Sequence, residues 1–237
     1  MKKIKAFCFD VFGTVVDWRE SIAREAQSFL ASHGVSESPH DFADKWRAMY
    51  QPALQECRSG KRPFTRLDIL HRENLEAVLS SYKIDVAAIG KQELAHLNLA
   101  WHRLDPWPDV LTGLTRLKRD YIIAPASNGN IALMVNLAKR AGIPWDAILG
   151  AEVTQAYKPA PQAYTRMGDI LGLELEEICM VAAHNSDLHA ARLCGLTTAF
   201  VARPTEHGAG QTKDLEPAEP WDIIAVDFND LADQVGG

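Results

Sequence analysis

The chain has 237 residues, of which 47% are hydrophobic and 24% are charged, and its formal net charge is −6. These values are typical of a globular protein with room for one large domain and a modest insertion. The acidic balance provides no basic surface for nucleic acid or for an anionic membrane, so we expect neither as a partner.

Hydropathy and cysteine usage indicate where the protein works. No segment approaches the ~18 uninterrupted apolar residues of a transmembrane helix, and the N-terminus shows no cleavage pattern of a signal peptide. The four cysteines, at positions 8, 57, 179 and 194, form no C-x-x-C pair, which favours reduced thiols over disulfides or a zinc site. We therefore expect a cytoplasmic protein.

The first predicted element is a short strand that ends in an acid. The run Ile4–Phe9 is apolar except for Lys5 and is too short for a typical helix, so it predicts a buried strand with Asp10 at its carboxyl end. Open parallel sheets place their chemistry at that end. Gly13 then permits a sharp turn, and Thr14 supplies a hydroxyl. An isolated Asp at a strand end is more often a helix cap, so this segment alone leaves both roles open.

The region from residue 17 to residue 105 is predicted to be helical, because apolar residues recur at helical spacing and no strand-like alternation occurs. The predicted helices cover Ile22–Leu30, Phe42–Leu54, Leu67–Leu79 and Gln92–Trp101. A helical stretch of this length after a single strand is typical of a cap inserted into an α/β core, and Pro106–Pro108 marks the return. We expect a core domain of residues 1–16 and 106–237 and a cap domain of residues 17–105.

From residue 109 onward, predicted helices and strands alternate. The strands cover 121–126, 147–149, 178–183, 197–202 and 222–226, and the helices cover 110–117, 131–141, 164–171 and 188–194, with a final helix near Leu231. This alternation predicts an α/β fold: a doubly wound, mostly parallel, Rossmann-like sheet with the helical cap inserted. Pro125 is unusual within a strand, so we place it at the very end of its strand. Residues 204–220 are expected to form a mobile surface loop.

Three further predicted strand ends carry polar groups. Ser127 and Asn128 follow the strand 121–126 and could hold a carboxylate or cap the next helix. Lys158 lies on a stiff, proline-rich segment, and its ammonium could keep Asp10 ionised by charge pairing, although a solvated surface lysine is the common alternative. His184 follows the strand 178–183 and is either a pocket residue or an ordinary loop histidine.

Taken in order, these segments resemble the four motifs of the haloacid dehalogenase superfamily. The segment Phe9–Val15 is similar to its first motif, whose aspartate is a covalent nucleophile, and the resemblance assigns that role to Asp10. The other three resemblances lie at Ser127-Asn128, at Lys158-Pro159 and in the loop Ala182–Asp187. The resemblance spans essentially the whole chain, with the cap supported only by helix pattern and length.

Two positions depart from the phosphatases of that superfamily. Phosphatases carry a second aspartate two residues after the nucleophile and an acid in the fourth motif that holds magnesium, whereas this chain has Phe12 and Ala183. Phe12 cannot donate a proton, and magnesium would find too few oxygen ligands. The resemblance therefore implies the 2-haloacid dehalogenase branch, whose typical tyrosine matches Tyr164, with no metal and no cofactor.

In that branch, the resemblance implies a two-step hydrolysis. Asp10 would displace halide from a short 2-haloalkanoic acid and form an ester, which water oriented by Asp187 and Lys158 would then cleave. The implied catalytic residues are Asp10, Lys158, Asp187 and Thr14. The implied substrate-binding residues are Arg58 in the cap, Ser127, Asn128, Tyr164, His184 and Asn185, with Arg47, Arg62 and Arg66 as alternatives to Arg58 for gripping the carboxylate.

The substrate itself stays open, because the commoner dehalogenases carry serine and asparagine where this chain has Ala182 and His184. A histidine donor predicts a preference for small, strongly hydrated leaving groups, such as fluoride or chloride from a haloacetate. The alternatives are hydrolysis of another small carboxylate such as a strained-ring amino acid, a phosphatase activity, and a catalytically inactive binding protein. Family members are often homodimers, so the resemblance also allows a homodimer.

Overall fold

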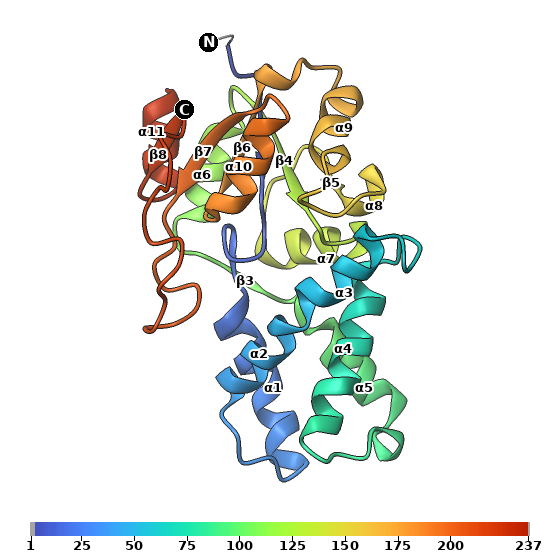
Figure 1. Cartoon of the computed structure of the whole chain (residues 1–237). Coiled ribbons are helices and arrows are strands. Elements are labelled where there is room, and N and C mark those ends of the chain that lie inside the picture. The colour runs from blue at the N-terminus through green and yellow to red at the C-terminus, as the bar shows by residue number, and fades with distance from the viewer. Residues whose placement is uncertain (1–2, 237) are drawn as a thin grey trace. The chain divides into compact units, whose positions relative to one another are not determined.

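A computed structural model of the chain describes residues 3–236. The chain divides into two compact units, which we describe separately: a core unit of Met1–Asp17 and Asp105–Gly237, and a helical unit of Trp18–Leu104 (Figure 1). The helical unit begins one residue later and ends one residue earlier than the expected cap domain. Within the described residues, no helix combines the length and the apolar composition needed to cross a membrane.

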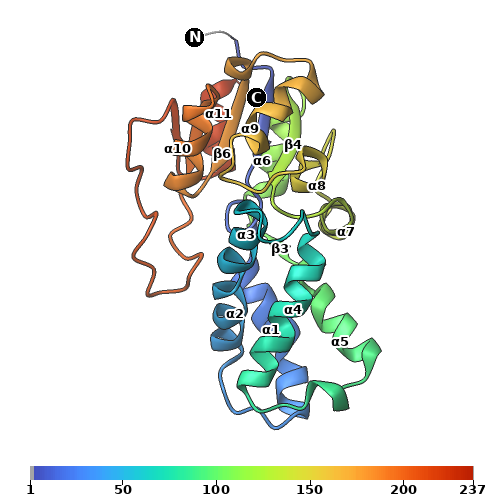
Figure 2. The same cartoon turned by 45° about the vertical axis from the view of Figure 1, so that its right-hand side comes forward.

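The core unit is built on a six-stranded sheet with the order β5-β4-β1-β6-β7-β8, in which every neighbouring pair is parallel. The strands are β1 (Ala6–Phe9), β4 (Ile122–Ser127), β5 (Leu149–Gly150), β6 (Ile178–Ala182), β7 (Thr197–Val201) and β8 (Ile223–Ala225). Helices cover both sides of this sheet (Figures 1 and 2). The predicted α/β, Rossmann-like fold class is therefore confirmed.

Strand order places three loops at one point of the sheet. β1 lies between β4 and β6, with Phe9 opposite Pro125 on one side and Val181 on the other. Along the chain, β4 and β5 are added on one side of β1, and β6, β7 and β8 are added on the other side. The carboxyl ends of β4, β1 and β6 therefore lie next to one another. Such switch points are where open parallel sheets bind their ligands.

Alternate residues of β1 face opposite layers of helices. Ala6 and Cys8 belong to an apolar cluster that includes residues of α9 (Gln162–Leu171) and α10 (Asn185–Leu193). Phe9 faces the other layer, where its ring centroid lies 5.3 Å from that of Phe228. Phe228 begins α11 (Phe228–Val235), which packs against α6 (Val110–Leu117). Burial on both faces fixes β1, and with it the position of the loop that follows.

Pro125 is not the last residue of its strand, contrary to the sequence prediction. β4 continues through Ala126 and Ser127, both of which pair with β5. Ile122 donates its backbone N–H to Lys5 on the β1 side, so by alternation the nitrogen of Pro125 faces the β5 side. The ladder with β5 begins only at Ala126, and the missing N–H of proline therefore costs no hydrogen bond there.

Two short strands flank the point at which the chain leaves and re-enters the core unit. β2 (Val16–Asp17) pairs antiparallel with β3 (Asp105–Pro106). The remaining core helices are α7 (Ile131–Ala141) and the short α8 (Ala151–Thr154).

The helical unit contains α1 (Trp18–Ser32), α2 (Pro39–Ala48), α3 (Tyr50–Arg58), α4 (Leu67–Ser81) and α5 (Lys91–Asn98), with 3-10 turns at Val86–Ala88 and Leu99–His102. The single helix predicted over Phe42–Leu54 is wrong, because the chain breaks at Met49 between α2 and α3. Pro52 has no N–H to donate to the carbonyl of Ala48, so a continuous helix would lose a hydrogen bond at that point.

Aromatic rings form the centre of the helical unit. The ring of His71 stacks on Trp101 at 4.4 Å between centroids, and Trp46 packs edge-on against Trp101 at 5.5 Å. Burial lowers the pKa of His71 to about 3, so this imidazole is neutral and acts as one more ring of the core.

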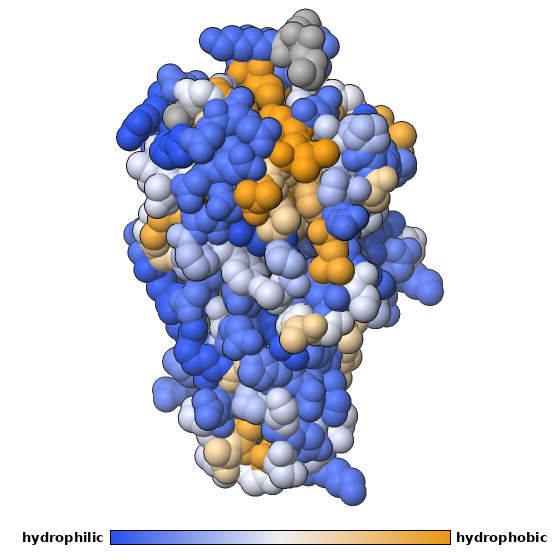
Figure 3. All heavy atoms as spheres, turned by 90° about the vertical axis from the view of Figure 1, so that its left-hand side faces the viewer, coloured by the Kyte–Doolittle hydropathy of each residue, from blue (hydrophilic) through white to orange (hydrophobic). Residues whose placement is uncertain are grey.

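The surface on the side shown in Figure 3 is mostly hydrophilic, with one larger group of apolar residues in the upper part of the view and smaller apolar spots elsewhere. Among the described residues of the core unit, Leu193 and Val226 are the most exposed large apolar side chains, at 76% and 71%. Val226 directly follows β8, the edge strand of the sheet. An edge strand as short as β8 offers few free backbone groups for pairing with another chain.

Candidate active site

Asp10 lies directly after β1 and is 8% exposed. Its Oδ1 is 2.8 Å from Nζ of Lys158, and its Oδ2 accepts a hydrogen bond of 2.8 Å from the hydroxyl of Thr14. Burial alone would raise the pKa of Asp10, but the charges of Lys158 and His184 and their hydrogen bonds hold it far below its ordinary value. Asp10 is therefore a desolvated carboxylate that stays ionised, which is the state a nucleophilic acid needs.

Thr14 connects the ends of two strands. Its hydroxyl is fully buried and accepts a hydrogen bond of 2.9 Å from the backbone N–H of Ala183, at the end of β6. Because that contact uses the hydroxyl as an acceptor, its proton is free to be donated to Asp10. Thr14 thus fixes one oxygen of Asp10 against the neighbouring strand.

Lys158 lies between two carboxylates. Its Nζ contacts Oδ1 of Asp10 and also Oδ2 of Asp187, whose other oxygen accepts a 2.6 Å hydrogen bond from Tyr164. The backbone N–H of Lys158 donates to the side-chain oxygen of Asn128 at 2.8 Å. Burial alone would lower the pKa of Lys158, but the charges of the two carboxylates raise it above its ordinary value. The ammonium of Lys158 is therefore permanently charged. Asn128 holds the backbone of Lys158, and Tyr164 holds its partner Asp187.

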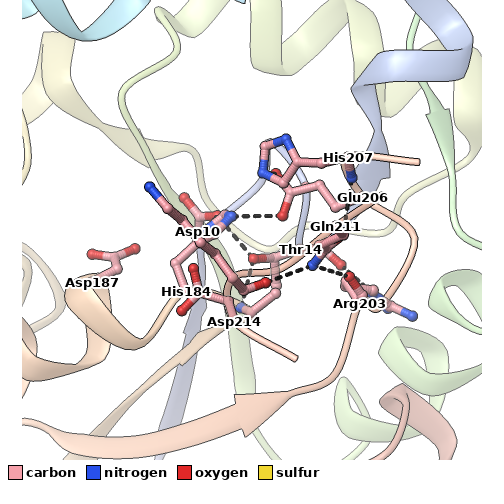
Figure 4. A network of polar contacts seen from close by, with 12 residues as sticks. Asp10, Thr14, His184, Asp187, Arg203, Glu206, His207, Gln211 and Asp214 are labelled. Atoms are coloured by element: carbon pink, nitrogen blue, oxygen red, sulfur yellow. Dashed lines mark hydrogen bonds and ion pairs between the residues drawn. The ribbon is translucent and has the colours of Figure 1, made fainter. Parts of the chain in front are cut away.

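His184, the residue before α10, lies beside Asp10 (Figure 4) and contacts the carboxylate oxygen that Lys158 does not contact. Its Nδ1 lies 3.2 Å from Oδ2 of Asp10, and its Nε2 lies 2.8 Å from Oε2 of Glu206. Burial alone would lower the pKa of His184, but the charges of Glu206 and Asp10 and their hydrogen bonds raise it well above its ordinary value. The structure thus brings His184 together with Asp10, Thr14, Lys158 and Asp187.

Sequence reasoning missed Glu206, which is only 1% exposed. It lies in the segment 204–220, which has no helix or strand and is mostly exposed, as expected of a surface loop, but Glu206 itself is turned inward. Arg203 donates from Nε to the carbonyl of Thr14 at 2.9 Å and forms a two-bond ion pair with Asp109. Gln211 donates to the carbonyl of Arg203 at 3.0 Å. The only signal in the sequence was the length of this connection, which exceeds that of most loops in compact domains.

Gly13 makes room for Glu206. A Cβ atom on Gly13 would lie 2.0 Å from Oε1 of Glu206, and the φ angle of Gly13 is +91°, which favours glycine. The glycine of the first motif therefore serves two purposes here. It turns the chain after Asp10, and it lets the carboxylate of Glu206 approach that turn.

Two of the residues expected to bind substrate, Ser127 and Asn185, form hydrogen bonds with other groups of the protein. The hydroxyl of Ser127 accepts from the backbone N–H of Gly129 at 3.0 Å, within its own turn. The side chain of Asn185 donates to Asp214 and accepts from the indole N–H of Trp221, both at 2.9 Å. We therefore assign Asn185 to holding the long loop against α10 rather than to binding substrate.

The arginines expected to grip a carboxylate belong to the helical unit. Arg58 donates to the side-chain oxygens of Gln51 and Gln55. Arg62 is held by both oxygens of Glu73, at 2.5 and 2.7 Å. The charge of Arg62 is thus already paired.

Arg47 has different surroundings. Its guanidinium carbon lies 4.2 Å from the ring centroid of Tyr50 and 5.4 Å from that of Trp18, whereas Arg66 is an exposed residue. A guanidinium against aromatic rings is partly desolvated and held in a fixed plane. These contacts favour Arg47 over Arg58, our first choice from the sequence.

The two positions that carry acids in phosphatases are buried and apolar, with Phe12 at 3% and Ala183 at 1% exposure. Among residues 3–236, no three His, Cys, Asp or Glu side chains gather as a metal ion would require. Of the acids at the site, Asp10 and Asp187 are instead paired with Lys158, and Glu206 is paired with His184. Independence of metal remains a prediction, which is tested below.

Known proteins resemble this chain over its whole length. A crystal structure of a defluorinating L-2-haloacid dehalogenase superposes with a TM-score of 0.97 at 51% identity, covering 99% of this chain and 96% of that one. A second L-2-haloacid dehalogenase gives a TM-score of 0.93 at 44% identity, covering 98% and 99%. The (S)-2-haloacid dehalogenase 4A of Burkholderia cepacia is 27% identical, over 97% of this chain and 98% of its own. The family model of haloacid dehalogenase-like hydrolases matches residues 4–195, and the chain belongs to this family, as its motifs predicted.

Proposed function

We propose that this protein is a hydrolase of carbon–halogen bonds that removes halide from short 2-haloalkanoic acids through an ester on Asp10. The observation that carries the proposal is the pairing of a buried, ionised Asp10 with Lys158 and Thr14, beside Phe12 in place of a proton-donating acid. The whole-length likeness to two L-2-haloacid dehalogenases at 51% and 44% identity supports the same substrate class.

In the first step, an oxygen of Asp10 attacks the carbon that bears the halogen. A carbon–oxygen bond forms, the carbon–halogen bond breaks, and the halide leaves with the bonding electron pair. A single displacement inverts the configuration at that carbon. The low pKa of Asp10 means that no proton has to be removed before the attack. Thr14 and Lys158 restrict the carboxylate to one orientation, which lowers the entropic cost of reaching the transition state.

In the second step, water attacks the carbonyl carbon of the Asp10 ester and releases the 2-hydroxy acid. Asp187 shares the ammonium of Lys158 with Asp10, and we assign it to take one proton from the water and pass it to the alcohol oxygen as the bond from that oxygen to the Asp10 carbonyl carbon breaks. The second proton of the water leaves with solvent, and Asp10 is restored as a carboxylate. Tyr164 donates to Asp187, and burial together with Asp187 raises the pKa of Tyr164, so the phenol remains a neutral donor. The charge of Lys158 stabilises the negative charge that develops as water adds.

The substrate carboxylate requires a cation, and we assign this role to Arg47 of the helical unit. Its contacts with Tyr50 and Trp18 hold the guanidinium in one plane, ready for a two-bond contact with a carboxylate. Arg58 is the alternative, and the two arginines are compared in the Discussion.

The leaving halide requires hydrogen-bond donors, and the donor that distinguishes this site is His184, whose Nδ1–H faces Asp10 at 3.2 Å and is released toward the halide as that carboxylate becomes an ester. Fluoride needs more stabilisation than bromide as it leaves, because its charge is more concentrated. We therefore propose that fluoroacetate is among the substrates. Likeness to a dehalogenase described as defluorinating supports this choice.

Halide release from a panel of substrates tests the proposed function. The panel contains fluoro-, chloro- and bromoacetate, both enantiomers of 2-chloropropionate, and a phosphate monoester as the contrasting substrate. We expect halide release from the haloacids and inversion at the carbon of 2-chloropropionate. Phosphate release without halide release would reject the proposal in favour of a phosphatase.

A further inference from the structure

The two ring nitrogens of His184 each face a carboxylate. Nδ1 lies 3.2 Å from Asp10 and Nε2 lies 2.8 Å from Glu206 (Figure 4). A neutral imidazole carries only one N–H, and an ionised carboxylate can only accept hydrogen bonds. Both contacts are hydrogen bonds only when both nitrogens are protonated. The geometry by itself therefore points to an imidazolium.

The charges around the site lead to the same state. Three carboxylates belong to this cluster: those of Asp10 and Asp187 contact the ammonium of Lys158, and that of Glu206 contacts His184. A neutral His184 would leave this buried group with an excess of two negative charges before an anionic substrate binds. A positive His184 halves that excess, which lowers the cost of burying the acids.

Further charged side chains of the described residues lie near this cluster. The imidazole of His207 lies 3.7 Å from Oε1 of Glu206 and is half exposed. Asp214 accepts two hydrogen bonds from Asn185, at the first residue of α10. The nearby guanidinium of Arg203 is neutralised by Asp109.

Glu206 is held in place by contacts that do not involve His184. Arg203, three residues earlier, is tied to the carbonyl of Thr14 and to Asp109. The carboxylate of Glu206 lies against the Cα of Gly13, in the turn that follows the nucleophile. This anchoring fixes the direction in which Glu206 accepts from His184. Glu206 also lies beyond residue 195, where the match to the family model ends.

We propose that Glu206 is a positioning residue of the reaction centre, which keeps His184 as an imidazolium with one N–H directed at Asp10. The proposal rests on the proposed function for its catalytic meaning. When Asp10 becomes an ester it loses its charge and can no longer stabilise a proton on His184. Glu206 keeps its charge throughout the reaction, so His184 remains a cation while the halide leaves and water attacks.

Nitrogen NMR of the wild-type protein with labelled histidine tests the protonation state without any assay of activity. We expect the His184 ring to show two protonated nitrogens at about pH 5 and to keep both up to about pH 8, as the pH rises through the ordinary histidine pKa of about 6.5. Its signal is identified by its loss in His184→Asn. A His184 ring with a single protonated nitrogen at pH 7 would overturn the proposal, whatever the protein proves to catalyse.

The pH dependence of kcat tests the role of Glu206. Glu206→Gln keeps the shape and a hydrogen-bond acceptor but removes the charge, so the pKa of His184 should fall. We expect the midpoint of the basic limb to move to lower pH by about one unit or more. Glu206→Asp keeps the negative charge, so the midpoint of its basic limb should lie close to that of the wild type.

A matched control removes a similar charge away from the site. Glu219 accepts from His189 at 2.8 Å on the exposed side of α10, so Glu219→Gln should leave the basic limb unchanged. A Glu206→Gln enzyme with the wild-type midpoint would reject the proposal, even if its kcat were lower at every pH. Should that variant fail to fold, the NMR state of wild-type His184 decides. Absence of halide release by the wild type would reject the proposed function and leave the NMR result standing.

Discussion

Nζ of Lys158 lies 2.8 Å from Oδ1 of Asp10, although the two residues are 148 positions apart in the sequence. Both side chains are almost completely buried, at 9% and 8% exposure. Removing one partner of a buried ion pair of this kind strongly destabilises the folded protein, because the other charge is left without compensation. Variants of this site are therefore informative only when they preserve shape, and the predictions below use such substitutions.

Asp10→Asn should abolish turnover while the protein remains folded. The amide has nearly the shape of the carboxylate but is a poor nucleophile, and Lys158 keeps Asp187 as its ionic partner. We expect kcat to fall at least about 10⁴-fold, with circular dichroism unchanged. Single turnover of the wild type in heavy-oxygen water should place the label in Asp10. Label found in the product alone would exclude the ester.

Thr14→Val should weaken both stability and turnover. Valine has the shape of threonine but leaves the N–H of Ala183 without its acceptor and Asp10 without a donor. We expect a loss of about 1–3 kcal/mol in the free energy of unfolding, measured with denaturant. Thr14→Ser keeps the hydroxyl and is the control. Equal kcat values for the valine and serine variants would show that the hydroxyl does not orient Asp10.

His184→Asn should affect substrates according to their halogen. Fluoride depends most on a strong donor as it leaves, so we expect fluoroacetate turnover to fall by about 10²-fold and bromoacetate turnover to fall less. The measurement is halide release at saturating substrate for both acids. An equal fall for both would mean that His184 only shapes its loop.

Arg47→Lys should raise KM for 2-chloropropionate. A lysine keeps the charge but loses the planar, two-bond contact with a carboxylate and the stacking on Tyr50. We expect an increase of about tenfold or more in KM, whereas Arg58→Lys should change KM less than threefold, by about 0.6 kcal/mol or less. The reverse order of the two variants would return the role to Arg58, as we first expected from the sequence.

Chelation should leave activity intact. Phe12 and Ala183 stand where the acids of a magnesium site would be required, and Asp10 and Asp187 are paired with Lys158. We expect the same kcat before and after exhaustive dialysis against EDTA. Loss of activity that magnesium restores would contradict the mechanism proposed here.

The sequence determined the fold class and the polar residues at the strand ends, because both depend on local patterns. Apolar runs of strand length that alternate with helical periodicity predicted the parallel sheet, and parallel strands bring their carboxyl ends to one edge. Asp10 and His184 follow strand ends and could be selected for that reason, whereas Lys158 lies beyond α8 and was indicated by the resemblance of Lys158-Pro159 to the third motif. The break at Met49 also has a local cause in the sequence, because Pro52 lacks the N–H that a continuous helix would need.

Tertiary structure alone decided how these groups are paired. No pattern along the chain indicates that Glu206 turns inward, since its burial depends on Arg203 reaching Thr14 and Asp109, which lie far away in the sequence. The segment 204–220 has the composition of a solvated loop. Composition gives no indication of ion pairs between residues that are far apart in the sequence. The charge state of His184 follows from two such distant carboxylates, so only the folded chain sets it.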